Sequence, residues 1–322
     1  MGGSLSSLES MFLPGSSFSQ RVNSRDLQHN GAKTIPLTVF DKPLIKTYTR
    51  EVRGRVLMPN IDANGNRFNY EVSGPEGAPW ITFSNSLMTN LHMWDEQADL
   101  LSQNWRVLRY DQRGHGGSSA TTPPYNFDLL GEDIVAIWDA LGVEQSVFCG
   151  LSMGGATGLG LCLNYPERIR AFIGCDMPYQ ASPEFAALWD QRMEMAREVG
   201  IDGMAMPTAE RWFVSSFVEN PQNKQVIEKI CTMVRTTSME GYVGCCNALQ
   251  TVAYADKMGL VKVPTFFISG SEDPAANPKA MKPLVDAVAG AEIHIIENCG
   301  HISNMENPES FNGALLNFLN QL

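Results

Sequence analysis

Several features are missing from this 322-residue sequence, and each absence excludes a class of protein. No apolar run approaches the roughly 18 residues that a membrane-spanning helix needs, and the N-terminus lacks the basic-then-apolar pattern of a signal peptide. No block of basic residues occurs, and the formal net charge is −11, so an extended surface for nucleic acid is not expected. We therefore predict neither stable membrane insertion nor a nucleic-acid partner.

Cysteine and histidine do not form the patterns of a disulfide framework or a metal site. The seven cysteines are odd in number, lack C-x-x-C spacing and lie mostly in apolar segments, which favours buried free thiols and a cytoplasmic location. No cluster of His, Cys or carboxylates predicts a metal ion. A dinucleotide cofactor is not predicted either, because Gly150-x-x-x-Gly154-Gly155 has the wrong spacing.

The first part of the chain, residues 1–52, is rich in Ser, Gly, Asn and Pro and has weak periodicity. Such a composition predicts an N-terminal extension that is partly irregular. Met1-Gly2-x-x-x-Ser6 fits the N-myristoylation pattern, but no polybasic segment accompanies it. Whether Gly2 is modified therefore stays open.

Strand patterns begin at Gly54. The runs Arg55–Met58 and Arg67–Val72 are strand-like, and Asn64-Gly65 between them is a strong hairpin signal. Short apolar strand candidates, most of them separated by helical patterns, follow at residues 80–83, 105–110, 146–149, 171–174, 265–269 and 292–296. This alternation predicts an α/β fold, with a mostly parallel twisted sheet and helices on both of its faces.

Residues 178–261 break the alternation. They hold several helical patterns rich in Met, Trp and Phe and no convincing strand, and the segment is too long for an ordinary crossover connection. Because ligands bind at the carboxyl edge of such sheets, an insertion there predicts a helical lid over the site. Residues 53–177 and 262–322 then form the core.

The motif Gly150-x-Ser152-x-Gly154 lies between a short apolar strand and the helical run Ala156–Asn164. A serine at the apex of a sharp strand-to-helix turn is the pattern of a nucleophile elbow, and the glycines leave room where the two backbones approach. At the start of the helix, the N–H of Met153 can stabilise an oxyanion. We predict that Ser152 is a catalytic nucleophile.

A serine nucleophile needs a base, which in turn needs an orienting acid. The order expected on this fold is serine, acid, histidine. His301 follows the last strand and is the candidate base, whereas its rival His115 precedes the serine. Asp273, directly after the penultimate strand, is the candidate acid. Asp176, after the strand at 171–174, is an alternative that the sequence leaves open.

Further candidates come from the loop after residues 80–83 and from the insertion. The N–H of Leu87 is the predicted second oxyanion donor. Candidate substrate-binding side chains are Met88, Tyr179, Trp189, Trp212 and Tyr242. Aromatic side chains commonly line ligand cavities, but packing within the lid is the alternative role for each of those in the insertion.

Together these motifs resemble the α/β-hydrolase superfamily and, more narrowly, the 3-oxoadipate enol-lactonases of aromatic catabolism. The similarity runs from about Asn66 to the C-terminus; its motifs lie at residues 84–87, 93–95, 111–116, 150–155, 210–213, 238–242 and 304–308. The resemblance implies a triad of Ser152, Asp273 and His301, with Leu87 and Met153 as oxyanion donors. It also implies a small carboxylate-bearing substrate, for which Arg192, Arg211 and Arg235 are candidate cations.

Three departures from that family put the identity of the lactone in doubt. Met88 stands where the enol-lactonases usually carry glycine, residues 177–180 are Met-Pro-Tyr-Gln rather than small residues, and an extension precedes the core. We predict a serine hydrolase that opens a lactone or carboxylic ester through an acyl-enzyme. The alternatives are a hydrolase of a bulkier polyketide or phenolic lactone in secondary metabolism or detoxification, and a ligand receptor on the same fold. The oligomeric state is open, and a homodimer is one hypothesis.

Overall fold

The computed structural model describes residues 59–322, whose strands form one eight-stranded sheet in the order β1-β2-β4-β3-β5-β6-β7-β8. The strands are β1 Asn60–Ala63, β2 Asn66–Ser73, β3 Trp80–Ser84, β4 Arg106–Tyr110, β5 Ser146–Leu151, β6 Ile169–Cys175, β7 Thr265–Gly270 and β8 Glu292–Ile296. β2 pairs antiparallel with β1 and β4, and the remaining neighbours pair parallel. The predicted mostly parallel sheet is confirmed.

The hairpin at the start of the sheet has a different first strand from the predicted one. β1 pairs with β2 across Asn64-Gly65, and both turn residues have positive φ, at 44° and 67°, as a tight hairpin turn requires. The strand predicted at residues 55–58, like the predicted extension 1–52, lies outside the described residues. β1 lacks an apolar signal because it is an edge strand whose side chains are exposed or half-buried.

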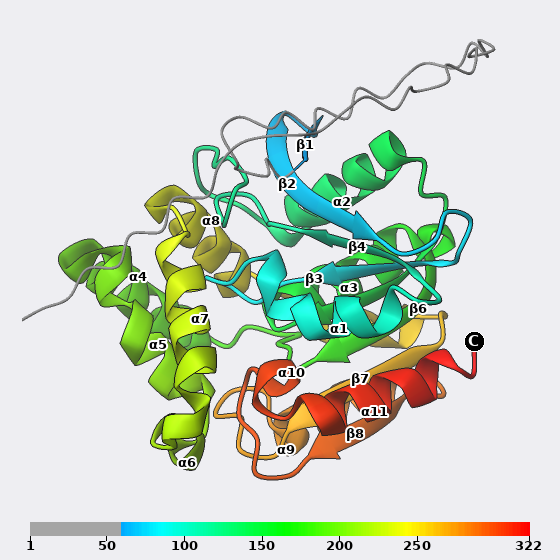
Figure 1. Cartoon of the computed structure of the whole chain (residues 1–322). Helices are drawn as coiled ribbons and strands as arrows, with labels where there is room; N and C mark the ends of the chain where they lie inside the picture. The colour runs from blue at the N-terminus through cyan, green and yellow to red at the C-terminus, as the bar shows by residue number, and fades with distance from the viewer. Residues whose placement is uncertain (1–58) are drawn as a thin grey trace, which may run out of the picture. The chain divides into compact units, whose positions relative to one another are not determined.

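Helices cover both faces of the sheet (Figure 1). α1 (Asp95–Leu101) and α11 (Pro308–Leu319) lie on one face, and α2 (Phe127–Leu141), α3 (Met153–Asn164) and α9 (Pro278–Ala287) lie on the other. Short elements complete the core: η1 Leu91–Trp94, η2 Pro166–Arg168 and α10 Ser303–Glu306. Apolar strands buried on both sides therefore form the centre of the sheet, as expected for a parallel arrangement.

The segment between β6 and β7 contains helices and no strand. These helices are α4 Pro183–Gly203, α5 Ala205–Trp212, α6 Ser215–Val218, η3 Pro221–Asn223, α7 Lys224–Arg235, α8 Met239–Gln250 and η4 Ala255–Leu260. Figure 1 shows them beside the edge at which the parallel strands end. Within residues 59–322, no helix is long and apolar enough to cross a membrane. All seven cysteines are buried and none forms a disulfide, so the prediction of buried free thiols is confirmed.

Candidate active site

Ser152 lies at the turn between β5 and α3. Its φ and ψ are 56° and −116°, a backbone conformation that is strained for a residue other than glycine. The N–H of Ser152 donates to the carbonyl of Cys175 at 2.8 Å, which holds the turn against the end of β6. The sharp strand-to-helix turn predicted from the glycine spacing is therefore present.

The glycines of this turn are required by close backbone packing. A Cβ on Gly150 would lie 2.2 Å from the carbonyl oxygen of Gly154, and one on Gly154 would lie 2.3 Å from the carbonyl oxygen of Ser84. Non-bonded atoms do not approach this closely. Neither glycine could carry a side chain unless the turn moved.

His301 and Asp273 form a direct hydrogen-bonded pair. His301 lies on the loop between β8 and α10, Asp273 follows β7, and the distance from Nδ1 of His301 to Oδ2 of Asp273 is 2.7 Å. Oδ1 of Asp273 accepts the N–H of Ala275 at 2.8 Å. Burial alone would raise the pKa of Asp273, but His301 and the backbone N–H groups outweigh burial and lower this pKa. Asp273 is therefore ionised at neutral pH and can accept from the imidazole N–H.

Asp176, the alternative acid, has other partners. It is fully buried just after β6, where one carboxyl oxygen accepts the N–H of Gly270 at 2.7 Å and the other lies 2.5 Å from Oγ of Ser303. Burial and the nearby charge of Asp273 raise the pKa of Asp176 well above its ordinary value. No hydrogen bond in residues 59–322 joins Asp176 to His301, so the imidazole is paired with Asp273.

The two predicted oxyanion donors lie on segments that contact one another. The carbonyl of Asn85, in the loop after β3, accepts the N–H of Gly154 in α3 at 3.0 Å. In the described part of the chain, neither Leu87 nor Met153 pairs its backbone N–H with an acceptor. Met88 in the same loop has φ 63°, the left-handed region that favours glycine, which gives a physical reason for the glycine that enol-lactonases usually carry there.

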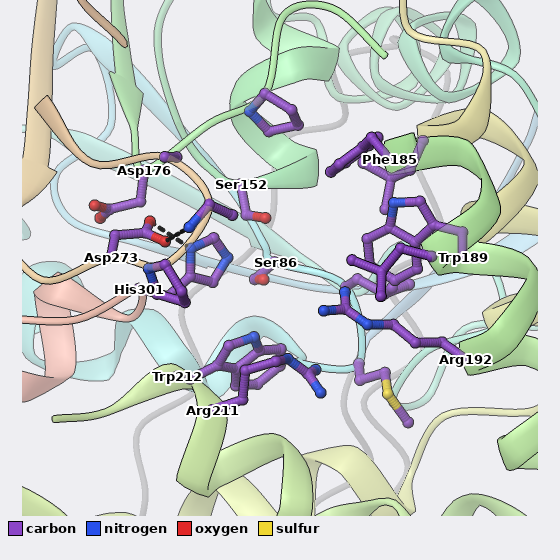
Figure 2. Close-up of a pocket in the computed structure, with 18 of the residues that line it drawn as sticks. Ser86, Ser152, Asp176, Phe185, Trp189, Arg192, Arg211, Trp212, Asp273 and His301 are labelled. Carbon is purple, nitrogen blue, oxygen red and sulfur yellow. Dashed lines mark hydrogen bonds and ion pairs between the residues drawn. The ribbon is translucent and has the colours of Figure 1, made fainter. Parts of the chain in front are cut away.

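A cavity of about 540 Å³ joins these groups to the helical insertion (Figure 2). Ser152, Asp273 and His301 line it, together with six side chains predicted from the sequence to contact substrate: Met88, Trp189, Arg192, Arg211, Trp212 and Tyr242. Leu87 lines it as well. The indole of Trp212 lies beside the imidazole of His301, with 6.1 Å between the ring centroids. The insertion therefore forms the wall of the cavity away from the sheet.

Arg192 and Arg211 line this cavity without a carboxylate partner in residues 59–322. The guanidinium of Arg192 lies 4.6 Å from the centroid of the Trp189 ring. Burial, followed by repulsion from Arg192, lowers the pKa of Arg211 to about 10, and burial also lowers that of Arg192. Two neighbouring cations without an ion-pair partner are unfavourable in a partly buried site, and a bound anion would relieve that cost.

Two predicted substrate contacts lie outside the cavity. Tyr179 does not line it; its neighbour Pro178 does. The carbonyl of Tyr179 accepts the N–H of Tyr254 at 2.9 Å. Arg235 is half-exposed on the surface, where its Nε lies 3.9 Å from Asp202. Neither Tyr179 nor Arg235 therefore lies with the other predicted substrate-binding residues in this cavity.

Several lining residues were not predicted. Phe185 lies one helical turn before Trp189 and packs edge-on against it, with 5.8 Å between the ring centroids. The four-residue spacing of these aromatic residues was a signal that could have identified Phe185. Ser86 also lines the cavity; it belongs to the motif at residues 84–87, but no role was predicted for its side chain. The remaining unpredicted lining residues are Pro178, Glu184, Leu188, Leu249, Pro274, Ala275 and Ala276.

His115, the rival base, is fully buried away from the cavity lining. Its Nδ1 lies 3.1 Å from the carbonyl of Arg113, and burial lowers its pKa to about 4. The imidazole is therefore neutral at physiological pH. It packs within its own loop, which contacts α8 through Gly114 and Gly241.

The family model described as the alpha/beta hydrolase fold matches residues 79–308. The chain therefore belongs to the α/β-hydrolase superfamily. Within that superfamily it is similar to 3-oxoadipate enol-lactonase 2 of Acinetobacter baylyi, with 35% identity over 77% of this chain and 91% of the relative. It is also similar to 3-oxoadipate enol-lactonase 1 of the same organism, with 32% identity over the same shares of the two chains.

Solved structures agree with this assignment. The enol-lactonase from Burkholderia xenovorans superposes with a TM-score of 0.77 and 36% identity, over 81% of this chain and 100% of that one. A hydrolase from Pseudomonas aeruginosa superposes with a TM-score of 0.77 and 32% identity, over 81% and 97% of the two chains. The protein is thus an α/β hydrolase similar to enol-lactonases.

Proposed function

We propose that this chain is a serine hydrolase that opens a lactone or ester carrying a carboxylate. The observation that carries the proposal is one cavity that holds Ser152, the His301–Asp273 pair and two arginines without a carboxylate partner. The similarity to enol-lactonases supports the same chemistry. We further propose that the helical insertion, residues 178–261, acts as a lid over the bound substrate.

In the proposed reaction, Oγ of Ser152 attacks the carbonyl carbon while Nε2 of His301 accepts the hydroxyl proton. Asp273 accepts from Nδ1–H, which fixes the imidazole tautomer and stabilises the imidazolium. The N–H groups of Leu87 and Met153 donate to the carbonyl oxygen as it becomes an oxyanion. Collapse of the tetrahedral intermediate breaks the C–O bond, and the leaving oxygen takes the proton from His301.

The resulting acyl-enzyme is hydrolysed through the same groups. His301 removes a proton from water, the hydroxide oxygen attacks the acyl carbon, and Ser152 leaves with the proton returned by His301. Arg192 and Arg211 would hold the substrate carboxylate through charge-assisted hydrogen bonds. That contact positions the lactone carbonyl at Ser152 and offsets the long-range repulsion between an anion and a chain of net charge −11.

The size of the cavity supports a second candidate substrate. A volume of about 540 Å³ lies within the range of drug-sized ligand sites and leaves room around a small lactone. A bulkier lactone bearing an aromatic ring would use that room against Phe185, Trp189 and Trp212. This candidate differs from the first in size, not in chemistry.

The test compares a γ-lactone that carries an acetate side chain with the corresponding primary amide, which is neutral. We expect kcat above about 1 s⁻¹ for the anionic lactone and no turnover by Ser152→Ala. Arg192→Met and Arg211→Met should each raise KM for the anion at least tenfold, because a hydrogen bond to a charged group is worth about 1.5–3 kcal/mol. The amide should be nearly unaffected.

Arg235→Met is the matched control, because this surface arginine lies outside the cavity. It should leave KM unchanged for both the anionic lactone and the neutral amide. A single turnover followed by arrest would favour the receptor alternative. Equal responses of the anionic and neutral lactones in all variants would contradict the assignment of a carboxylate-bearing substrate.

A further inference from the structure

The side chain of Ser86 is a buried hydroxyl without a hydrogen-bond partner at the wall of the cavity. Ser86 is 1% exposed, and its Oγ pairs with no group in the described part of the chain. An unsatisfied buried hydroxyl is unfavourable, and in native proteins each such group calls for an explanation. Ser86 lines the same cavity as Ser152, His301 and Arg192, and Figure 2 draws its hydroxyl among these side chains.

The loop around Ser86 does not need this hydroxyl. The carbonyl of Ser86 accepts from both the N–H and Oγ1 of Thr89, and its N–H donates to Sδ of Met93. The hydroxyl of Ser84, two residues earlier, is 2.8 Å from that of Tyr110. Main-chain groups and neighbouring side chains thus hold the loop, and Oγ of Ser86 contributes no bond to it.

The position of Ser86 along the chain points to one acceptor. Only four covalent bonds separate its Oγ from the backbone nitrogen of Leu87, the proposed oxyanion donor, so a single ligand oxygen can receive hydrogen bonds from both groups. A hydroxyl rotates about its C–O bond to suit an acceptor that arrives with the substrate. The carbonyl oxygen above Ser152 is such an acceptor.

We infer that the hydroxyl of Ser86 is a third oxyanion donor, which contacts the carbonyl oxygen of the substrate alongside the N–H groups of Leu87 and Met153. This inference rests on the proposed hydrolase function. When Ser152 attacks, the carbonyl π pair moves onto the oxygen, and Ser86 donates a hydrogen bond to that oxyanion. Its proton is not transferred, and the proton from Ser152 goes to His301 as before.

The test is Ser86→Ala in the full-length chain, assayed with the anionic lactone. Loss of one oxyanion donor lowers kcat on the order of 10²-fold in related chemistry, and we expect a fall in kcat of that size with KM changed by less than about threefold. The inhibition constant of a trifluoromethyl ketone analogue of the lactone, which forms an oxyanion at Ser152, should rise by the same factor as kcat/KM falls. The melting temperature should stay the same or rise, because the variant removes an unsatisfied hydroxyl.

Thr89→Val is the matched control. It removes a hydroxyl from the same loop, but one that is bonded within the loop to Ser86 and Met93. We expect it to lower the melting temperature and to leave kcat within about threefold of wild type. Equal kcat losses in the two variants would show that Ser86 acts only through loop structure and would overturn the inference.

Two further outcomes would also overturn it. If the wild-type chain hydrolyses the lactone and Ser86→Ala leaves kcat/KM unchanged, the donor role of Ser86 is rejected while the proposed function stands. A rise in KM with unchanged kcat would instead make Ser86 a contact that binds the substrate in the ground state. By contrast, absence of Ser152-dependent hydrolysis in the wild-type chain would overturn the proposed function itself and this role with it.

Discussion

Two aspartates after neighbouring strands have opposite pKa shifts. Asp273, after β7, is held ionised by His301 and backbone N–H groups, whereas burial and the charge of Asp273 raise the pKa of Asp176, after β6. Environments that separate the pKa values of two carboxyl groups also separate their roles. We assign the acid of the proposed triad to Asp273 and a packing role to Asp176, which is protonated over a wider pH range.

Exchanging each aspartate for asparagine tests this assignment. Asp273→Asn should lower kcat about 10⁴-fold, because the wrong imidazole tautomer is favoured. Asp176→Asn should retain kcat within about threefold, since Oδ1 of an asparagine can still accept the N–H of Gly270, and the hydroxyl of Ser303, which donates to Asp176, can rotate to accept from the new amide group. Both rates are measured with the anionic lactone, and the reverse ranking would move the acid to Asp176.

Stability against pH gives a second measurement on Asp176. Folding raises its pKa, so its contribution to the free energy of unfolding is greatest below the unfolded-state value of about 3.9 and falls as pH rises toward the folded-state pKa. Asp176→Asn removes this titration. The unfolding free energy of the variant, relative to wild type, should therefore increase with pH above about 4, and a constant difference would contradict the raised pKa.

At the scale of elements, the end of α5 is joined to the loop that carries His301. The N–H of His301 donates to the carbonyl of Trp212 at 2.6 Å. Glu306, in α10, accepts the N–H of Val214 at 2.8 Å and that of Gly300 at 2.5 Å. A single carboxylate and one backbone hydrogen bond therefore join the end of α5 to the loop that carries His301.

Glu306→Gln tests this connection. The amide offers one acceptor oxygen, so at least one of the two backbone N–H groups loses its partner, at a cost of about 1–3 kcal/mol of unfolding free energy. We expect a lower urea midpoint and a kcat reduced roughly tenfold, because His301 is held less well. Glu309→Gln, an exposed glutamate on α11, should change neither quantity, and an unaltered kcat in Glu306→Gln would show that the connection serves stability alone.

At the scale of the whole molecule, the burial of all seven thiols predicts that the native protein reacts slowly with thiol reagents. Burial raises the pKa of thiols such as Cys162, Cys175 and Cys245, and the thiolate is the reactive form. The native protein should scarcely react with dithiobis(nitrobenzoate) over minutes, and the denatured chain should release seven equivalents without reductant. Leu260→Cys, at a 64% exposed position, should add one fast equivalent, and a fast native thiol in the wild type would contradict the burial.

Sequence alone determined the features that depend on local chemistry. The apolar runs located β3 to β8, and the glycines at 150 and 154 identified the turn around Ser152, because strand burial and backbone contact act over a few residues. The order of serine, acid and histidine along the chain narrowed the candidate base to His301. The exposed edge strand β1 was missed, since it carries no apolar pattern.

The tertiary structure decided which distant groups meet. Asp273 and Asp176 both follow sheet strands, and only the packed loops brought one of them within 2.7 Å of His301. The same packing placed Arg192 and Arg211 in the cavity and Arg235 on the surface, although the three look alike in sequence. It also left the hydroxyl of Ser86 without a partner. Such outcomes depend on contacts between residues far apart in the chain, and local pattern does not encode the distances between them.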